Sequence, residues 1–310
     1  MKTVLVTGGN SFTARHLIPV LKADGLTVRQ LCNSDVDVKD QDLLADITDL
    51  EALRVAISGV DIDYVIHLAG ISFAAHQRPL ELYNVNVLGT ENLLKSITDN
   101  APNVQKIILA SSANIYGSQA QSNPVLDESL CPEPVNHYAV SKLAMEHMSR
   151  TWMDRLPITC VRPFNYTGRG QDEKFLVPKI ISHFASKADE IELGNINVAR
   201  DFTDVRVVSN CYLKLLYAKK AIGETVNICS GRLIKLKEIV AYAEEISGHS
   251  LAIKVNPDFV RKSEIMELRG DPTYLYSLIG PVEHSEIRET LAWMLQDGVT
   301  HEECMKREVY

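Results

Sequence analysis

Near its N-terminus the chain reads Lys2-Thr-Val-Leu-Val-Thr7 and then Gly8-Gly-Asn-Ser-Phe-Thr-Ala14. The first stretch is a short apolar run of the kind that forms a buried parallel strand. A strand, a glycine turn and a helix in this order bring the N–H groups of a helix N-terminus onto a pyrophosphate. The pattern therefore predicts a dinucleotide-binding α/β fold, although an ordinary strand–turn–helix has the same local signature.

Two positions of the glycine turn depart from the usual spacing. Glycine is expected at positions 11 and 14, where this chain has Ser11 and Ala14. Alanine still lets helix and strand approach closely. The Cβ of Ser11 crowds a pyrophosphate, while its hydroxyl could donate a hydrogen bond to it. Gly8 can supply the tight turn, and Phe12 can pack the helix on the sheet.

Strands and helices alternate through the first half of the chain. The expected strands are residues 2–7, 26–32, 64–68, 104–110 and 158–162, and the expected helices are residues 12–24, 84–99 and 137–155. Such alternation predicts an α/β protein with a Rossmann-type, doubly wound parallel sheet and right-handed crossovers. We expect this dinucleotide-binding domain to occupy residues 1–163.

The alternation is lost after Arg162. We expect residues 164–310 to form mainly a smaller C-terminal lobe that binds the substrate, while late elements near residues 205–230 return to the main sheet. The expected elements of this part are helices at residues 177–187, 235–247 and 286–295, and strands at 225–229 and 251–255.

Composition excludes several classes of protein. The 310 residues have a net charge of -8, and an acidic surface argues against nucleic-acid binding, because phosphate contacts need a basic footprint. Six cysteines without a C-x-x-C pair favour free thiols in a reducing cytosol and no metal site. No apolar run approaches the ~20 residues of a membrane span, so we expect a cytoplasmic protein with no membrane partner.

Three polar side chains point to acid–base chemistry. Tyr138 and Lys142 are four residues apart in an expected helix, which places them on one face. A nearby ammonium favours the phenolate and lowers the pKa of a tyrosine. Ser112 ends a central strand, where the sites of open α/β sheets gather. Ser112 would bind a substrate carbonyl and Tyr138 would donate a proton while a dinucleotide delivers hydride.

The cofactor choice depends on the end of the second strand. An acidic residue there selects NAD, and a basic residue accepts the extra phosphate of NADP. This chain has Cys32-Asn-Ser34 at that point and no acid before Asp35. Asn33 and Ser34 could hydrogen-bond to either group. NAD(H) and NADP(H) both stay open, with a slight preference for NADP(H).

The motifs resemble those of the extended short-chain dehydrogenase/reductase family of nucleotide-sugar epimerases, dehydratases and reductases. The resemblance covers essentially the whole chain and rests on these stretches, in the family's order: His67-Leu-Ala-Gly70, Asn86-Val-Leu-Gly-Thr90, Ser112 with Tyr116-Gly117, Tyr138-x-x-x-Lys142, Arg162-Pro-Phe-Asn165 and Arg200-Asp-Phe-Thr-Asp-Val205. The resemblance also implies a homodimer in which residues 84–99 and 138–153 of two chains form a four-helix bundle.

The motifs and the resemblance together assign a cofactor site. Its members are Gly8, Asn10, Ser11, Phe12, Thr13, Asn33, Ser34, Asp46, Ile47, Leu68, Ala69, Gly70, Ser72, Asn86, Ala110, Tyr138, Lys142 and Pro163. Within this set, Asp46 and Ile47 are expected beside the adenine.

The two positions directly after Ser112 limit which subfamilies the chain can resemble. The 4,6-dehydratases of the family have an Asp-Glu pair there, and GDP-fucose synthase has a cysteine directly after the serine. This chain has Ala113 and Asn114, and neither side chain is suited to acid–base work. Simple carbonyl reduction and 4-epimerisation remain.

The C-terminal half is similar to GDP-4-keto-6-deoxymannose reductases, through Phe164–Gln171, Asn256–Arg261, Glu264 and Gly270-Asp271. The resemblance implies a GDP-linked substrate, with Arg200 and Arg261 on the diphosphate, Glu264 on a ribose hydroxyl, and Val177 and Lys179 along the base. The complete expected substrate set is Ser72, His76, Ser112, Asn114, Asn165, Val177, Lys179, Arg200, Arg261 and Glu264.

Three functional hypotheses follow. The first is reduction of a nucleotide-linked 4-keto-6-deoxyhexose to GDP-D-rhamnose or GDP-6-deoxy-D-talose. The second is a 4-epimerase with tightly bound NAD. The third is a dinucleotide-sensing protein without catalytic activity, for which Ser11 is the only motivation.

Overall fold

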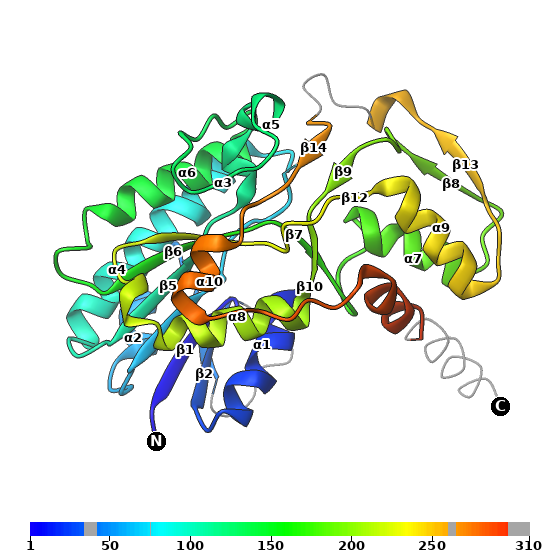
Figure 1. Cartoon of the computed structure of the whole chain (residues 1–310). Coiled ribbons are helices and arrows are strands. Elements are labelled where there is room, and N and C mark those ends of the chain that lie inside the picture. The colour runs from blue at the N-terminus through cyan, green and yellow to red at the C-terminus, as the bar shows by residue number, and fades with distance from the viewer. Residues whose placement is uncertain (34–41, 75, 260–264, 297–310) are drawn as a thin grey trace, which may run out of the picture.

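The apolar run at the N-terminus forms an inner strand of a parallel sheet. This is seen in a computed structural model, which describes residues 1–33, 42–74, 76–259 and 265–296. Within those residues seven strands have the order β11-β6-β5-β4-β1-β2-β3, and every neighbouring pair is parallel (Figure 1). The strands are β1 (Thr3–Thr7), β2 (Thr27–Cys32), β3 (Leu43–Leu44), β4 (Tyr64–His67), β5 (Lys106–Ala110), β6 (Ile158–Pro163) and β11 (Thr225–Ile228).

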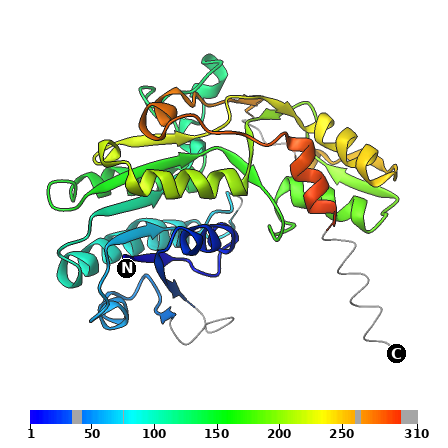
Figure 2. The same ribbon diagram turned by 60° about the horizontal axis from the view of Figure 1, so that its bottom comes forward.

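Side chains of each strand alternate between two apolar layers, as the pleat of a strand requires. In β1, Val4 and Val6 enter one layer with α1 (Phe12–Ala23) and α8 (Val205–Tyr217). Leu5 enters the other layer, which is covered by α2 (Leu50–Ile57), α4 (Gly89–Asn100) and α6 (His137–Arg150). Figures 1 and 2 show helices on both faces of the sheet. The predicted doubly wound fold is confirmed.

A smaller lobe follows β6, with its own apolar core beside the sheet (Figure 1). Two helices, α7 (Leu176–Ala185) and α9 (Leu236–Ser247), and the helical residues 287–296 enclose this core. Its short strands are β7 (Asn165–Thr167), β8 (Glu190–Leu193), β9 (Ala199–Arg200), β10 (Phe202–Asp204), β12 (Ile234–Lys235), β13 (Ala252–Val255) and β14 (Glu267–Leu268). The late elements α8 and β11 lie with the main sheet, and α10 (Thr273–Ile279) packs against them.

Two expected helices differ in detail from those observed. The helix expected at 84–99 begins with a π-helical segment, η1 (Asn84–Leu88). The hydroxyl of Thr90, in the first turn of α4, donates a hydrogen bond to the carbonyl of Asn86 at 2.7 Å. The segment η1 is preceded by the short α3 (Pro79–Tyr83). The helix expected at 137–155 ends at Arg150, and turns follow it.

Among the residues that the structure describes, no helix has the length and apolar character that a membrane span requires. The same residues contain no group of three or more His, Cys, Asp or Glu side chains placed to hold a metal ion.

Candidate active site

The turn after β1 is shaped by the close approach of two backbones. Gly8 has a φ of +67°, in the left-handed region that favours glycine. A Cβ at Gly8 would lie 2.8 Å from the backbone nitrogen of Ala69. The loop at the end of β1 is therefore packed directly on residues 68–70, which follow β4. Both loops were predicted to contact the dinucleotide.

Ser11, the departure from the usual glycine, caps the helix. Its side-chain oxygen accepts a hydrogen bond from the backbone N–H of Ala14 at 3.3 Å. Serine is among the best residues for this position because it satisfies a donor that the helix leaves free. Ala14 is fully buried in the sheet layer, so its small side chain permits the expected contact of helix and strand.

Phe12 does not pack the helix on the sheet, and that expectation was wrong. Its ring stacks on Tyr166 of β7, with centroids 6.1 Å apart and planes 13° apart. The hydroxyl of Thr13 is hydrogen-bonded to the hydroxyl of Tyr166 at 2.7 Å. Leu17 and Leu21, on the inner face of α1, pack on the sheet instead.

The three predicted catalytic side chains come together, each only 6% exposed. Ser112 follows β5 and caps the short helix η2 (Ala113–Tyr116), accepting from the N–H of Asn114 at 3.2 Å. Tyr138, in the first turn of α6, is hydrogen-bonded to Ser112. Lys142, one turn further, donates from Nζ to the carbonyl of Ala110 at 2.8 Å. Two adjacent hydroxyl groups therefore lie just beyond the carboxyl end of β5.

Burial controls the pKa values of this group. Burial raises the pKa of Tyr138 to about 12, and the hydrogen bond to Ser112 opposes this only in part. Burial also lowers the pKa of Lys142 to about 8. Burial therefore opposes the predicted lowering of the Tyr138 pKa by Lys142, because the loss of solvation disfavours the phenolate. Tyr138 therefore holds its proton at neutral pH.

A buried hydrogen-bond chain fixes the loop after β4. The Ala69 N–H donates to Thr7 Oγ1 at 3.2 Å, and Thr7 Oγ1 lies 2.6 Å from Nδ1 of His67. Nε2 of His67 lies 2.9 Å from Thr90 Oγ1. The Thr90 hydroxyl itself donates to the carbonyl of Asn86. Burial lowers the pKa of His67 to about 3. The imidazole is therefore neutral.

The side chain of Asn86 connects this series of hydrogen bonds to the catalytic helix α6. This side chain accepts from the N–H of Ile71 at 2.9 Å and donates to Ser141 Oγ at 3.0 Å. Ser141 in turn donates to the carbonyl of Tyr138 at 2.7 Å. A Cβ at Gly70 would lie 2.8 Å from Asn86 Oδ1 and 3.3 Å from Lys142 Nζ. Residues 68–71 therefore form a cradle beside Lys142. A side chain at position 70 would press on Asn86 and Lys142, so glycine keeps this space free.

The remaining predicted cofactor contacts lie around the carboxyl ends of the strands. Asn10 accepts from the Cys32 thiol at 3.1 Å, and Asn33 is exposed. Ile47 is buried, and Asn92 donates to its carbonyl at 3.2 Å. The exposed Asp46, the exposed Ser72 and the buried Pro163 complete the described part of the set. Ser34 lies outside the described residues.

The predicted substrate contacts in the lobe are only partly accessible. Asn165 is exposed at the start of β7. Lys179 donates from Nζ to the carbonyl of Glu192 at 2.8 Å, and Arg200 donates to the carbonyl of Ala199 at 2.8 Å. The side chain of Val177 is 3% exposed and belongs to the lobe core, so the expectation that it lines the base was wrong.

Four further substrate contacts complete the set. Asn114 donates from Nδ2 to Ser112 Oγ at 3.1 Å and so joins the catalytic group. His76 is held by Glu81, with Nε2 and Oε2 2.9 Å apart. Arg261 and Glu264 lie outside the described residues.

Sequence reasoning missed a buried ion pair behind the catalytic helix. Arg162 of β6 makes two hydrogen bonds to the Glu146 carboxylate, at 3.0 and 2.8 Å, and a third to the Tyr116 hydroxyl at 3.0 Å. A signal existed in the spacing, because Glu146 follows Lys142 by four residues and so shares its face of α6.

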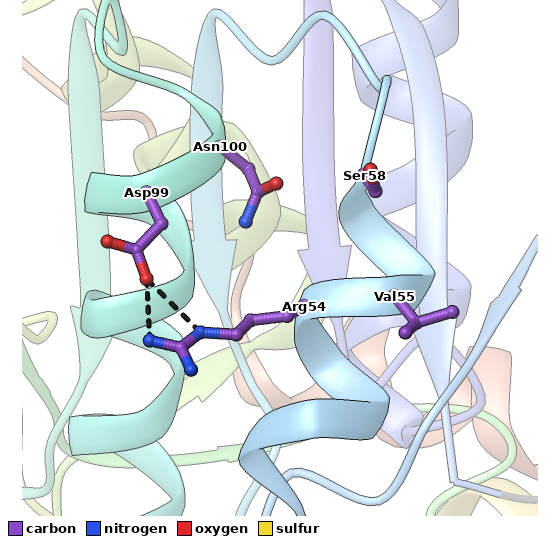
Figure 3. Close-up of a pocket in the computed structure, with 5 residues that line it drawn as sticks. All are labelled: Arg54, Val55, Ser58, Asp99 and Asn100. Carbon is purple, nitrogen blue, oxygen red and sulfur yellow. Dashed lines mark hydrogen bonds and ion pairs between the residues drawn. The ribbon is translucent and has the colours of Figure 1, made fainter.

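A separate hollow of about 580 Å³ contains none of these residues. Arg54, Val55 and Ser58 of the α2 region and Asp99 and Asn100 of α4 line it (Figure 3). Arg54 donates to Asp99 Oδ2 at 2.8 Å across the gap between the two helices, and Val55 points away from this pair. The hollow is a gap between the ends of two helices, and we assign it no role in catalysis.

The donors and openings fit a dinucleotide. A capped helix N-terminus faces the Gly8 turn, and the Gly70 cradle lies between that turn and Lys142. When bound, a nicotinamide cofactor supplies hydride. Residues 8–13 and 68–71 would orient it, and Tyr138 would hold a proton beside it.

The chain is similar to known proteins along most of its length. Residues 4–229 match the model of the NAD dependent epimerase/dehydratase family. GDP-6-deoxy-D-talose 4-dehydrogenase of Aggregatibacter actinomycetemcomitans is 38% identical, over 89% of this chain and 91% of that protein. GDP-6-deoxy-D-mannose reductase of Pseudomonas aeruginosa is 33% identical, over 76% of this chain and 80% of that protein.

A solved structure shows the same architecture. The structure of RMD from Pseudomonas aeruginosa, complexed with NADPH, has a TM-score of 0.84 to this chain and 29% identity, and covers 97% of this chain and 100% of that one. The family match spans most of the chain and includes the Gly8 turn, Ser112, Tyr138 and Lys142. The chain belongs to the NAD-dependent epimerase/dehydratase family of extended short-chain dehydrogenases/reductases.

Proposed function

We propose that the chain reduces a nucleotide-linked 4-keto-6-deoxyhexose with NADH or NADPH. The observation that carries the proposal is the buried hydrogen-bonded pair of Ser112 and Tyr138 beside Lys142. The names of the two curated relatives, both acting on GDP-6-deoxyhexoses, support GDP as the nucleotide. The expected product is GDP-D-rhamnose or GDP-6-deoxy-D-talose.

The mechanism follows from the two hydroxyl groups. Ser112 would hydrogen-bond to the C4 carbonyl oxygen and hold it against Tyr138. As hydride reaches C4, the C=O π bond breaks, and the phenolic proton passes to the oxygen to give a secondary alcohol. The pKa of about 12 keeps Tyr138 protonated for this direction. Lys142 and the loop at residues 68–71 would position the ribose beside it.

The surroundings of Ser112 support reduction over dehydration. Elimination of water from the hexose needs an acid and a base near the sugar. The side chain of Ala113 is 1% exposed, and Asn114 donates its amide to Ser112 at 3.1 Å. Neither residue can exchange a proton with a sugar carbon. We therefore retain reductase as the main proposal, with 4-epimerase as the alternative.

The substrate would lie between the sheet and the lobe. Asn165 of β7 and Arg200 of β9 would supply an amide and a guanidinium, and a guanidinium matches the geometry of a diphosphate. Arg261, Lys179 and Glu264 complete the proposed set on the basis of the sequence. The free thiols of the described cysteines suit a reducing compartment, and we propose a cytoplasmic enzyme.

The test is oxidation of NADH and NADPH by the purified protein with 4-keto-6-deoxyhexoses linked to GDP, dTDP, UDP and CDP. We expect rapid oxidation with the GDP-linked sugar, and the better cofactor identifies the coenzyme preference. Oxidation with none of the four, together with NAD bound in the purified protein, would contradict the reductase and favour the epimerase.

We also propose a homodimer through α6 and the helical segment formed by η1 and α4. Leu88 is 56% exposed and Val140 is 37% exposed, on neighbouring elements of one face. Burying such side chains against a second copy is favourable by about 25 cal/mol per Å².

Charge in this face should separate the two copies. We expect a variant with Leu88→Glu and Val140→Glu to elute as a monomer in size-exclusion chromatography with light scattering, while the wild type elutes at twice the chain mass. The control is Val55→Glu, because Val55 is 77% exposed but lies on α2. Identical masses for the wild type and the double variant would contradict the proposal.

A further inference from the structure

We propose that Tyr166 is a positioning residue that fastens the first turn of α1, the cofactor-binding helix, to the substrate lobe. The inference rests on the cofactor site described above, but it does not depend on which sugar is reduced. Tyr166 is the middle residue of β7. It makes a hydroxyl–hydroxyl hydrogen bond to Thr13 at 2.7 Å and a ring stack on Phe12.

The two contacts hold the part of α1 that matters for a dinucleotide. Ser11 is the N-cap, so Phe12 and Thr13 are the first two residues of the helix. The first N–H groups of a helix have no partner inside it and are the groups that bind a pyrophosphate. Tyr166 therefore fixes the direction of these N–H groups from outside the helix.

The hydroxyl of Thr13 is committed to this contact. Thr13 is 7% exposed, and its Oγ1 lies on Tyr166. Thr13 was predicted to bind the cofactor. Because its hydroxyl is hydrogen-bonded to that of Tyr166, its contribution to the cofactor is through the backbone N–H, and the side chain serves to orient that group.

On the side of the lobe, the contact is made by β7, which also contains Asn165, a residue proposed to bind the substrate. Asn165, directly before Tyr166, is exposed, and β7 pairs in parallel with β10, with Tyr166 opposite Thr203. Tyr166 also lies near enough to Tyr138 to raise its pKa. One side chain thus touches the cofactor helix, adjoins the proposed substrate strand and neighbours the proton donor.

A second contact one turn along α1 follows the same path. Nε2 of His16 lies 2.8 Å from the carbonyl oxygen of Arg169, two residues beyond β7. The segment that leaves the sheet at Pro163 is therefore tied to α1 twice. The tie at Tyr166 is the one that reaches the pyrophosphate turn.

We expect Tyr166→Phe to raise the Kd for NADPH and for NADH by about three- to tenfold. The lost bond is worth at most about tenfold in an equilibrium, and apparent affinity falls in proportion to the fraction of molecules with the turn correctly placed. The phenyl ring still stacks on Phe12. Thr13→Val should give the same change, and the double variant should be no weaker than either, because both remove one bond.

The matched control is Tyr217→Phe. The Tyr217 hydroxyl donates to Asp24, the C-cap at the far end of the same helix. Loss of this hydrogen bond should lower the Tm about as much as Tyr166→Phe does, and it should leave the Kd for both dinucleotides unchanged. Kd is measured by quenching of protein fluorescence on titration with each dinucleotide, and Tm by circular dichroism.

Two results would overturn the proposal. One is a wild-type Kd for both dinucleotides in Tyr166→Phe and in Thr13→Val. The other is an equal rise in Kd for Tyr217→Phe, which would mean that any loss of stability in α1 has the same effect. Thr13→Val keeps the test valid if Tyr166→Phe does not fold. Because no sugar nucleotide is used, failure here is separate from failure of the proposed reductase activity.

Discussion

Replacing Tyr138 with phenylalanine lowers kcat by about 10²- to 10⁴-fold, which is the usual contribution of a positioned general acid. The ring of Tyr138 is 6% exposed, and phenylalanine fills the same space. Only the proton and the hydrogen bond to Ser112 are lost. We expect the fold and the Kd for the dinucleotide to be unchanged. Turnover is measured with the best substrate from the sugar-nucleotide panel, or as epimerisation if that alternative holds.

A neighbouring tyrosine supplies the control. Tyr83→Phe removes a hydroxyl that lies 2.9 Å from Nδ1 of His137, the residue before Tyr138. It alters the same end of α6 without touching the proposed proton donor, so kcat should stay within a factor of about three, as expected when a surface hydrogen bond worth at most ~1 kcal/mol is lost. Full turnover in Tyr138→Phe would remove this tyrosine from the mechanism.

The largest loss of stability is expected from Arg162→Met. Arg162 is 3% exposed and Glu146 is 1% exposed, so the variant leaves a carboxylate buried without its cation. Breaking one side of a buried pair costs about 3–5 kcal/mol. The Tyr116 hydroxyl also loses a donor. The free energy of unfolding is measured by urea titration followed by circular dichroism.

Two comparisons make this expectation specific. The double variant Arg162→Met with Glu146→Gln should regain part of the loss, because no buried charge remains. Arg232→Met breaks a pair with Glu286 whose side chains are 58% and 70% exposed, and exposed pairs contribute only about 0–1 kcal/mol. A loss in Arg162→Met no larger than that in Arg232→Met would show that burial of this pair carries no special cost.

The sequence predicted the sheet and the catalytic group because both depend on local patterns. An apolar run followed by glycine is enough to place β1 and the turn, and a spacing of four puts Tyr138 and Lys142 on one face of α6. The parallel direction of the strands follows from their alternation with helices. These features need no knowledge of which distant residues meet.

The errors occurred where distant residues meet. Phe12 was expected on the sheet, but Tyr166, more than 150 residues away, offers an aromatic partner. Val177 was expected to line the base of the substrate, but its side chain is buried in the core of the lobe. The predicted lowering of the Tyr138 pKa by Lys142 took no account of burial, because the depth of burial is a property of the assembled fold. The local pattern of a sequence does not show which distant residues come into contact or how deeply a side chain is buried.

The position of β11 has a consequence for synthesis on the ribosome. The sheet is complete only when Thr225–Ile228 pairs with β6, and one of its faces is open until α8 has been made. After Pro163 emerges, the nascent chain therefore presents an unpaired apolar strand edge. Translation at about 5–20 residues per second leaves that edge open for several seconds, a period in which pairing with another chain competes with folding.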